Sequence, residues 1–103
     1  MELAFETKGL RRLCEHENVA IRKFGGVRAS KLKDRISDLE AAVSLQDLVF
    51  LGLNKKDSGS EISYELSVDD QISICFMANH AGADLQLHEI GRIKLTAIEI
   101  QNG

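Results

Sequence analysis

The chain has 103 residues, enough for one domain with a single modest core, so we treat residues 1–103 as one domain. Its 44% hydrophobic and 28% charged residues argue against intrinsic disorder, and no apolar run approaches the roughly 20 residues that a membrane-spanning helix needs. The net charge of −3 is unevenly spread: residues 1–56 carry eleven Lys and Arg against eight Asp and Glu (+3), and residues 57–103 carry two against eight (−6). Such asymmetry lets one face meet an anionic partner, although solvated surface explains it equally well.

Neither the N-terminus nor the cysteines indicate export. The chain begins MELAFETK, with acidic residues where a secretory signal has basic ones. Cys14 and Cys75 are far apart in the sequence and match no metal-binding or redox spacing, so we expect two buried, reduced thiols. These features favour a cytoplasmic protein.

The first half of the sequence predicts a short strand followed by helices. Leu3 and Phe5 alternate with acidic residues, as in a strand with one buried face. Thr7 is a candidate N-cap for the first helix, which should bend or break near Glu17–Asn18 because a charged residue takes an apolar position there. Gly25-Gly26 then ends that helix, since glycine adopts the left-handed conformation without steric cost.

A second helix is expected after the two glycines, antiparallel to the first, so that the two form a helical hairpin. Its apolar stripe comprises Ala29, Leu32, Ile36, Leu39 and Val43. Ser44 is a candidate N-cap for a short third helix.

The second half of the sequence changes to a period of two, which predicts strands. Two alternating segments around residues 62–67 and 72–76 flank the turn residues Asp69-Asp70, as in a hairpin. Residues 78–91 are mixed and predict a loop, and residues 93–100 predict an interior strand. The expected fold is α+β, in the order β-α-α-(α)-β-β-β, with an N-terminal helical hairpin packed on one face of a small twisted antiparallel sheet.

Five segments in a fixed order carry a family resemblance. They are LAFETKGLRRLCE, KFG, DLEAAVSLQDL, FMANH and RIKLTAIEI. Together they cover nearly all of the chain and resemble the RelE/HigB-type toxins of bacterial type II toxin–antitoxin pairs, in particular the branch of plasmid-maintenance killer proteins. The resemblance implies a RelE-like fold and a ribosome-dependent mRNA endoribonuclease, or mRNA interferase, which uses no metal or cofactor. It also implies a cognate antitoxin as partner, the ribosome and its mRNA as target, and contact with DNA only through the antitoxin complex.

The sequence departs from the family at three habitual catalytic positions. Ser73 stands where family members usually carry an arginine, and Ser58 and Gly59 replace an Arg-Lys pair before the hairpin. Many members end in Asp-Tyr-His, whereas this chain ends in residues 101–103, Gln-Asn-Gly. These departures leave open an alternative function on the same scaffold: a non-catalytic binding protein, either a gyrase-poisoning relative or a degenerate toxin that only binds its antitoxin.

Four residues are candidates for RNA cleavage. Lys55 and Lys56 are expected in the turn before the hairpin, where they would hold the scissile phosphate or simply form a solvated turn. His80 would be a general acid or base, or a loop histidine that caps backbone groups. Arg92 shares one face of the last strand with Lys94, so the pair would either line the concave side of the sheet or serve as edge charges.

The remaining candidates are RNA-binding residues. Arg28, Lys31 and Arg35 form a stripe on the second helix, and with Lys94 they would contact phosphates. The alternative is the polar side of an amphipathic helix, softened by nearby aspartates. The three histidines have no metal-ligand spacing, so we expect no metal site.

Overall fold

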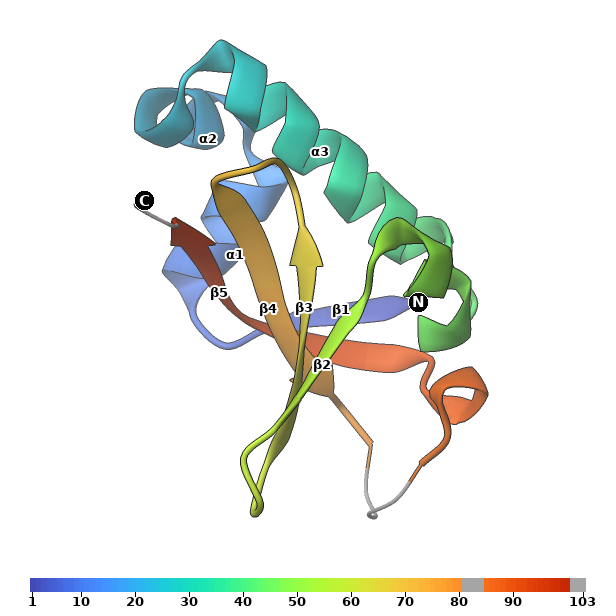
Figure 1. The fold of residues 1–103 in the computed structure, drawn as a ribbon. Helices are drawn as coiled ribbons and strands as arrows, with labels where there is room; N and C mark the ends of the chain where they lie inside the picture. Colours follow the sequence, from blue (N-terminus) through green and yellow to red (C-terminus); the bar gives the residue numbers. More distant parts are fainter. Residues whose placement is uncertain (81–84, 101–103) are drawn as a thin grey trace.

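The computed structural model describes residues 1–80 and 85–100. It has an α+β fold in which helices pack on one face of a five-stranded sheet (Figure 1). The elements, in which η denotes a short 3₁₀ helix, are β1 Glu2–Phe5, α1 Lys8–Glu15, α2 Glu17–Phe24, α3 Gly26–Ala41, η1 Leu45–Leu51, β2 Asn54–Asp57, β3 Ile62–Ser67, β4 Ile72–Ala78, η2 Leu87–Glu89 and β5 Arg92–Ile100.

The sheet is mixed, so the prediction of a purely antiparallel sheet is wrong. Its strand order is β1-β5-β4-β3-β2, and β1 pairs with β5 in parallel. The reason is topological: the helical layer carries the chain from β1 to the far edge of the sheet, and the meander from β2 to β5 then returns. The successive reversals of that meander leave β5 running in the same direction as β1.

The strand β2 was not expected, because the sequence predicts a turn there. Its residues are NKKD, all exposed, so no apolar alternation marks the strand. It pairs with β3 in the register Lys55 with Tyr64 and Lys56 with Ser63. This strand therefore forms an edge of the sheet and extends the predicted hairpin to a three-stranded meander.

The predicted start and end of the first helical segment are confirmed. The amide of Leu10 donates to Thr7 Oγ1 at 3.1 Å, as an N-cap requires. The first helix breaks at His16, one residue before the predicted position, and becomes α1 and α2. Gly25, at φ +84°, ends α2 and leads directly into α3. The Met1 ammonium donates to the carbonyl of Glu40 at 2.8 Å, near the end of α3.

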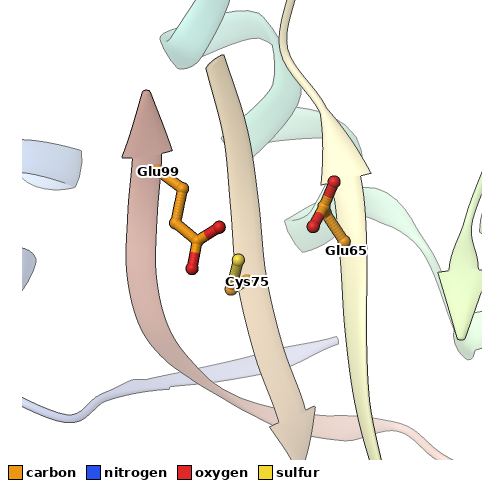
Figure 2. A group of neighbouring side chains, drawn as sticks. All are labelled: Glu65, Cys75 and Glu99. Carbon is orange, nitrogen blue, oxygen red and sulfur yellow. The ribbon is translucent and has the colours of Figure 1, made fainter. Parts of the chain in front are cut away.

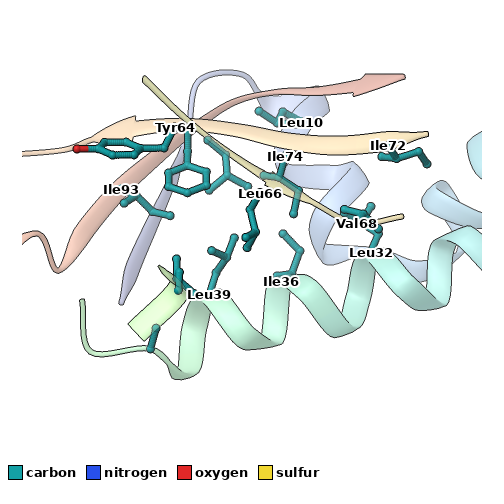
Figure 3. Packing of buried hydrophobic residues seen from close by; sticks show 14 of the residues in the cluster. Leu10, Leu32, Ile36, Leu39, Tyr64, Leu66, Val68, Ile72, Ile74 and Ile93 are labelled. Atoms are coloured by element: carbon teal, nitrogen blue, oxygen red, sulfur yellow. The ribbon is translucent and has the colours of Figure 1, made fainter. Parts of the chain in front are cut away.

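The core lies between the helices and the sheet. Leu32, Ile36 and Leu39 of α3 face Leu66 and Ile74 of the β3–β4 hairpin, and all five are buried (Figure 3). The predicted stripe on α3 is thus confirmed except at its last position.

The turn after α3 explains that exception. Because α3 ends at Ala41, Val43 leaves the helical register and is 81% exposed. The short third helix is present as η1, but the Ser44 side chain does not cap it. The Asp47 carboxylate instead accepts from the Val43 amide at 2.9 Å.

The side chains that alternate with the core residues lie on the other face of the sheet, opposite the face that the helices cover. We call it the open face. Cross-strand partners share a face, so the register assigns Glu65, Cys75 and Ala97 to it. Lys94, opposite Met77, belongs to the same face. A register shift between Cys75 and Phe76 keeps Leu95 in the core and Ala97 on the open face.

Candidate functional site

A groove of about 750 Å³ lies where β2, β3, the end of β4 and η2 meet. Apolar residues such as Leu53, Ile62 and Leu87 form much of its wall. Two of the predicted catalytic residues, Lys55 and His80, line it together with Tyr64. We call it the hairpin groove; it is on the side of the sheet that carries the helices, because Tyr64 stacks on the core residue Phe76 at a centroid distance of 5.9 Å.

His80 has a defined hydrogen-bonding role in this groove. Its Nε2 accepts from the amides of Gly91 at 3.1 Å and Arg92 at 3.2 Å. This pattern assigns the ring proton to Nδ1, because a nitrogen that accepts two amide hydrogens carries a lone pair. His80 therefore caps backbone groups at the start of β5, and Nε2 is not free to take a proton from a substrate.

Lys55 and Lys56 lie on opposite faces of β2. Lys55 pairs with Tyr64 and faces the hairpin groove, whereas Lys56 pairs with Ser63 and faces the open side. The two ammonium groups were expected to share one turn and one phosphate. The strand geometry separates them, so a single site uses one or the other.

The open face contains a group of potential ligand atoms that the sequence analysis missed. Glu65, Cys75 and Glu99 project from β3, β4 and β5 (Figure 2), and one ligand atom from each lies within 4.8 Å of the others. We call this group the thiol–carboxylate cluster. Its signal is the hairpin register, which pairs Glu65 with Cys75 because the turn is centred on Asp70. A two-residue turn at Asp69-Asp70, as the sequence suggests, would instead pair Glu65 with Ile74 and place Cys75 on the other face. The expectation of no metal site rests on histidine spacing alone and does not consider donors on three separate strands.

Lys56 supplies positive charge to this cluster. Its Nζ lies 2.5 Å from Oε2 of Glu65, whose side chain is only 13% exposed. The hydrogen bond and charge of Glu65 raise the pKa of Lys56. Burial, and then the charges of Glu99 and Glu65, raise the pKa of the Cys75 thiol to about 11, so this thiol is protonated near neutral pH.

The two cations of β5 share one face of the strand, as predicted, and the register shows that it is the open face. Arg92 lies opposite Glu2, and its Nε is 3.0 Å from Oε2 of that residue. Lys94 lies between Ala4 and Met77. Arg92 is therefore already paired with a carboxylate, in a solvent-exposed contact that contributes little stability.

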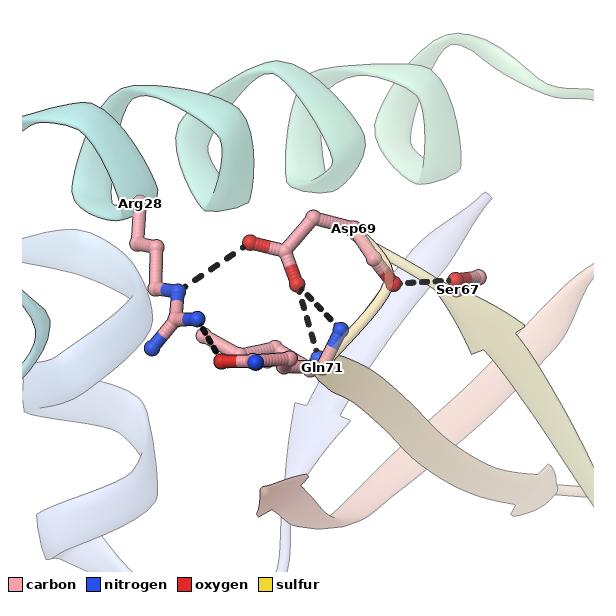
Figure 4. A network of polar contacts seen from close by, with 5 residues as sticks. Arg28, Ser67, Asp69 and Gln71 are labelled. Atoms are coloured by element: carbon pink, nitrogen blue, oxygen red, sulfur yellow. Dashed lines mark hydrogen bonds and ion pairs between the residues drawn. The ribbon is translucent and has the colours of Figure 1, made fainter. Parts of the chain in front are cut away.

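On α3, Arg28 is part of a network that fixes the β3–β4 turn (Figure 4). Its Nε lies 3.3 Å from Oδ2 of Asp69, and its Nη2 donates to Gln71. Oδ1 of Asp69 accepts from the amides of Gln71 at 2.7 Å and Ile72 at 2.8 Å. These contacts give Arg28 a structural role between helix and hairpin.

The other two predicted cations of α3 differ from each other. Arg35 Nη1 lies 3.2 Å from Oδ2 of Asp38, one of the aspartates expected to soften this stripe. Lys31 is exposed and forms no ion pair with residues in the described ranges. The stripe is therefore less positive than its sequence suggests.

A second cavity, of about 630 Å³, lies between β1 and the helices. Leu3, Phe5 and Leu13 are among its apolar lining residues, and Cys14 also lines it. Burial raises the pKa of the Cys14 thiol to about 12. Both cysteines are free thiols, as expected, but Cys14 and Cys75 are each only partly buried, so the prediction of two fully buried side chains is wrong.

Comparisons of the chain with protein-family models, with curated proteins and with solved structures found no significant match. The longest helix, α3, has 16 residues and mixes charged with apolar side chains. Within the described part of the chain, none of the helices could cross a membrane.

Proposed function

We propose that this protein is the toxin-type member of a type II toxin–antitoxin pair, with a RelE-like fold, and that it acts in the cytoplasm by binding rather than by cutting RNA. The five resembling sequence segments and the order of helices and strands support the family. The ion pairs that four of the predicted site residues form with carboxylates support binding without catalysis.

The observation that carries this proposal is the pairing of the predicted cations with carboxylates. Four of the eight predicted site residues are in ion pairs: Arg28 with Asp69, Arg35 with Asp38, Lys56 with Glu65 and Arg92 with Glu2. RNA binding depends on cations that neutralise phosphates and release counterions. A carboxylate beside each cation offsets its positive potential and repels a phosphate, even where the ion pair itself contributes little stability, so these residues form a poor phosphate-binding surface.

The open face is the surface that we assign to the antitoxin. Around its centre lie small or medium side chains, among them Ala4, Cys75, Met77 and Ala97, each partly exposed. Charged residues lie among them: Lys94 is between Ala4 and Met77, and the Glu65 and Glu99 carboxylates lie beside Cys75. A partly exposed sheet face that mixes small side chains with charges of both signs can pack against a partner chain and pair with its charged groups.

A second candidate function, mRNA cleavage, is supported by the hairpin groove. Lys55 and His80 both line this groove, and Lys55 has no ion pair among the residues that the structure describes. In this case the Lys55 ammonium would hold the scissile phosphate, and Nδ1–H of His80 would donate to one of its oxygens.

One set of assays separates these functions. The protein is expressed with and without the product of the adjacent open reading frame, and copurification, growth and the 5′ ends of cellular transcripts are measured. Our proposal predicts a stable complex and intact transcripts. New transcript ends in a translating lysate would favour the nuclease instead, and the absence of both a complex and a growth effect would exclude both functions. A gyrase supercoiling assay then tests one target of the binding protein.

A further inference from the structure

We propose that the thiol–carboxylate cluster, Glu65, Cys75 and Glu99, binds one divalent metal ion of the zinc type on the open face of the sheet. This inference is independent of the proposed function. It depends on the arrangement of three donors, on the buried position of one of them and on the balance of charge around them.

The geometry needs only small side-chain adjustments. The three donors come from adjacent, hydrogen-bonded strands, which fix their backbones relative to one another. Their ligand atoms already lie within 4.8 Å of one another, whereas the donors of a tetrahedral zinc ion are separated by about 3–4 Å. Rotation of the long Glu65 and Glu99 side chains can supply the difference of about 1 Å.

Glu65 is the donor whose position most needs a cation. Its side chain is 13% exposed, and its Oε2 is shielded from water without a hydrogen bond of normal geometry among the described residues. The close contact with Lys56 compensates its charge only in part, because Glu99 brings a second carboxylate to the same place. A buried carboxylate without full compensation is costly.

A divalent ion would neutralise this site completely. Coordination replaces the thiol proton of Cys75 with a sulfur–metal bond and releases that proton to solvent. Two carboxylates, one thiolate, the Lys56 ammonium and one divalent ion then sum to zero charge. One sulfur and two oxygen donors suit zinc better than magnesium or calcium, and three protein ligands leave a fourth position for water or for a group from a partner.

Cobalt(II) is the probe for this site, because a cobalt–thiolate bond produces a charge-transfer absorption that carboxylate or histidine binding does not. We expect the full-length protein to bind one equivalent of cobalt with this absorption, and zinc to displace it. Cys75→Ser should abolish the absorption, whereas Cys14→Ser, the matched control on the other side of the sheet, should retain it. Glu65→Gln and Glu99→Gln should each weaken binding at least tenfold, while Glu89→Gln should have no effect.

Lys56→Gln adds a test that separates this site from adventitious cobalt binding to a single thiol. Since Lys56 and the metal compete for Glu65, removing the ammonium should tighten cobalt binding. Circular dichroism establishes that each variant is folded. The inference is overturned if wild-type protein shows no thiolate absorption, if the absorption survives Cys75→Ser or is lost in Cys14→Ser, or if folded Lys56→Gln binds cobalt more weakly.

Discussion

Lys55 and Lys56 are adjacent in the sequence, but their side chains point to opposite faces of the sheet. Replacing each one by alanine should therefore have different consequences. Lys55→Ala should change the free energy of unfolding by less than about 0.5 kcal/mol, because the residue is exposed on an edge strand. Lys56→Ala should lower the midpoint of urea unfolding, because the mostly buried Glu65 carboxylate loses its cation.

The same two variants also distinguish the candidate functions. If the hairpin groove cleaves RNA, Lys55→Ala should abolish cleavage while Lys56→Ala retains it in the folded fraction. Equal loss of stability in both variants would contradict the assignment of the two side chains to different faces.

Asp69 should make the free energy of unfolding depend on pH in the acidic range. Hydrogen bonds from the backbone amides of Gln71 and Ile72, together with the charge of Arg28, lower the pKa of Asp69 below 3.8. Because this carboxyl holds its proton less tightly when folded, its contribution is fully present above the unfolded pKa and is lost as pH falls through the lowered folded value.

The variant Asp69→Asn tests this contribution. It should be less stable than wild type at pH 7, and the difference should shrink when urea unfolding is repeated below about pH 4. Asp70→Asn is the matched control, since Asp70 is the exposed neighbour in the same turn. A stability difference that stays constant with pH would show that the Asp69 charge is not involved.

His80 should contribute to stability through its backbone contacts. His80→Ala leaves the amides of Gly91 and Arg92 without their acceptor, and we expect a loss of about 1 kcal/mol in the free energy of unfolding. His88→Ala, at an exposed position in η2, should change it by less than about 0.5 kcal/mol. Similar values for both variants would argue against the capping role.

The two thiols should react slowly in the folded protein. Burial raises the pKa of Cys75 from 9.0 to about 11, so at pH 8 it should have about 100-fold less thiolate than an ordinary cysteine. Cys14, at about 12, should have less still. Iodoacetamide labelling read by mass spectrometry should therefore be fast in urea and slow in buffer, and fast labelling of either folded thiol would refute this.

The same two thiols should make the free energy of unfolding fall as pH rises above 9.0, because the unfolded chain ionises them at a lower pH than the folded protein does.

The features that could be predicted from the sequence have local causes. Thr7, Gly25 and the Asp69-Asp70 turn act through the backbone within a few residues, and the structure confirms all three. The strand β2 has four polar residues and exists because β3 offers it a hydrogen-bonding edge, which no local pattern reveals. The parallel pairing of β1 with β5 joins opposite ends of the chain and follows from the path of the helices.

The candidate site was less predictable, because ion pairs and clusters depend on strand register. The sequence gives no direct sign that Lys56 meets Glu65 or that Glu99 approaches Cys75. Each contact crosses from one strand to another, and a shift of one residue would reverse the faces. His80 was identified as a functional candidate, but its two backbone partners follow from how the end of β4 lies beside the start of β5.

The central claim is that the open face binds a cognate antitoxin, and calorimetric binding of the adjacent reading frame's product tests it most directly. Met77→Glu places a new charge on the open face, and Val27→Glu places the same residue on α3, where Val27 is 73% exposed. We predict that wild type and Val27→Glu bind with equal affinity and that folded Met77→Glu binds at least tenfold more weakly. Unchanged binding by Met77→Glu, or no binding by wild type, would contradict the claim.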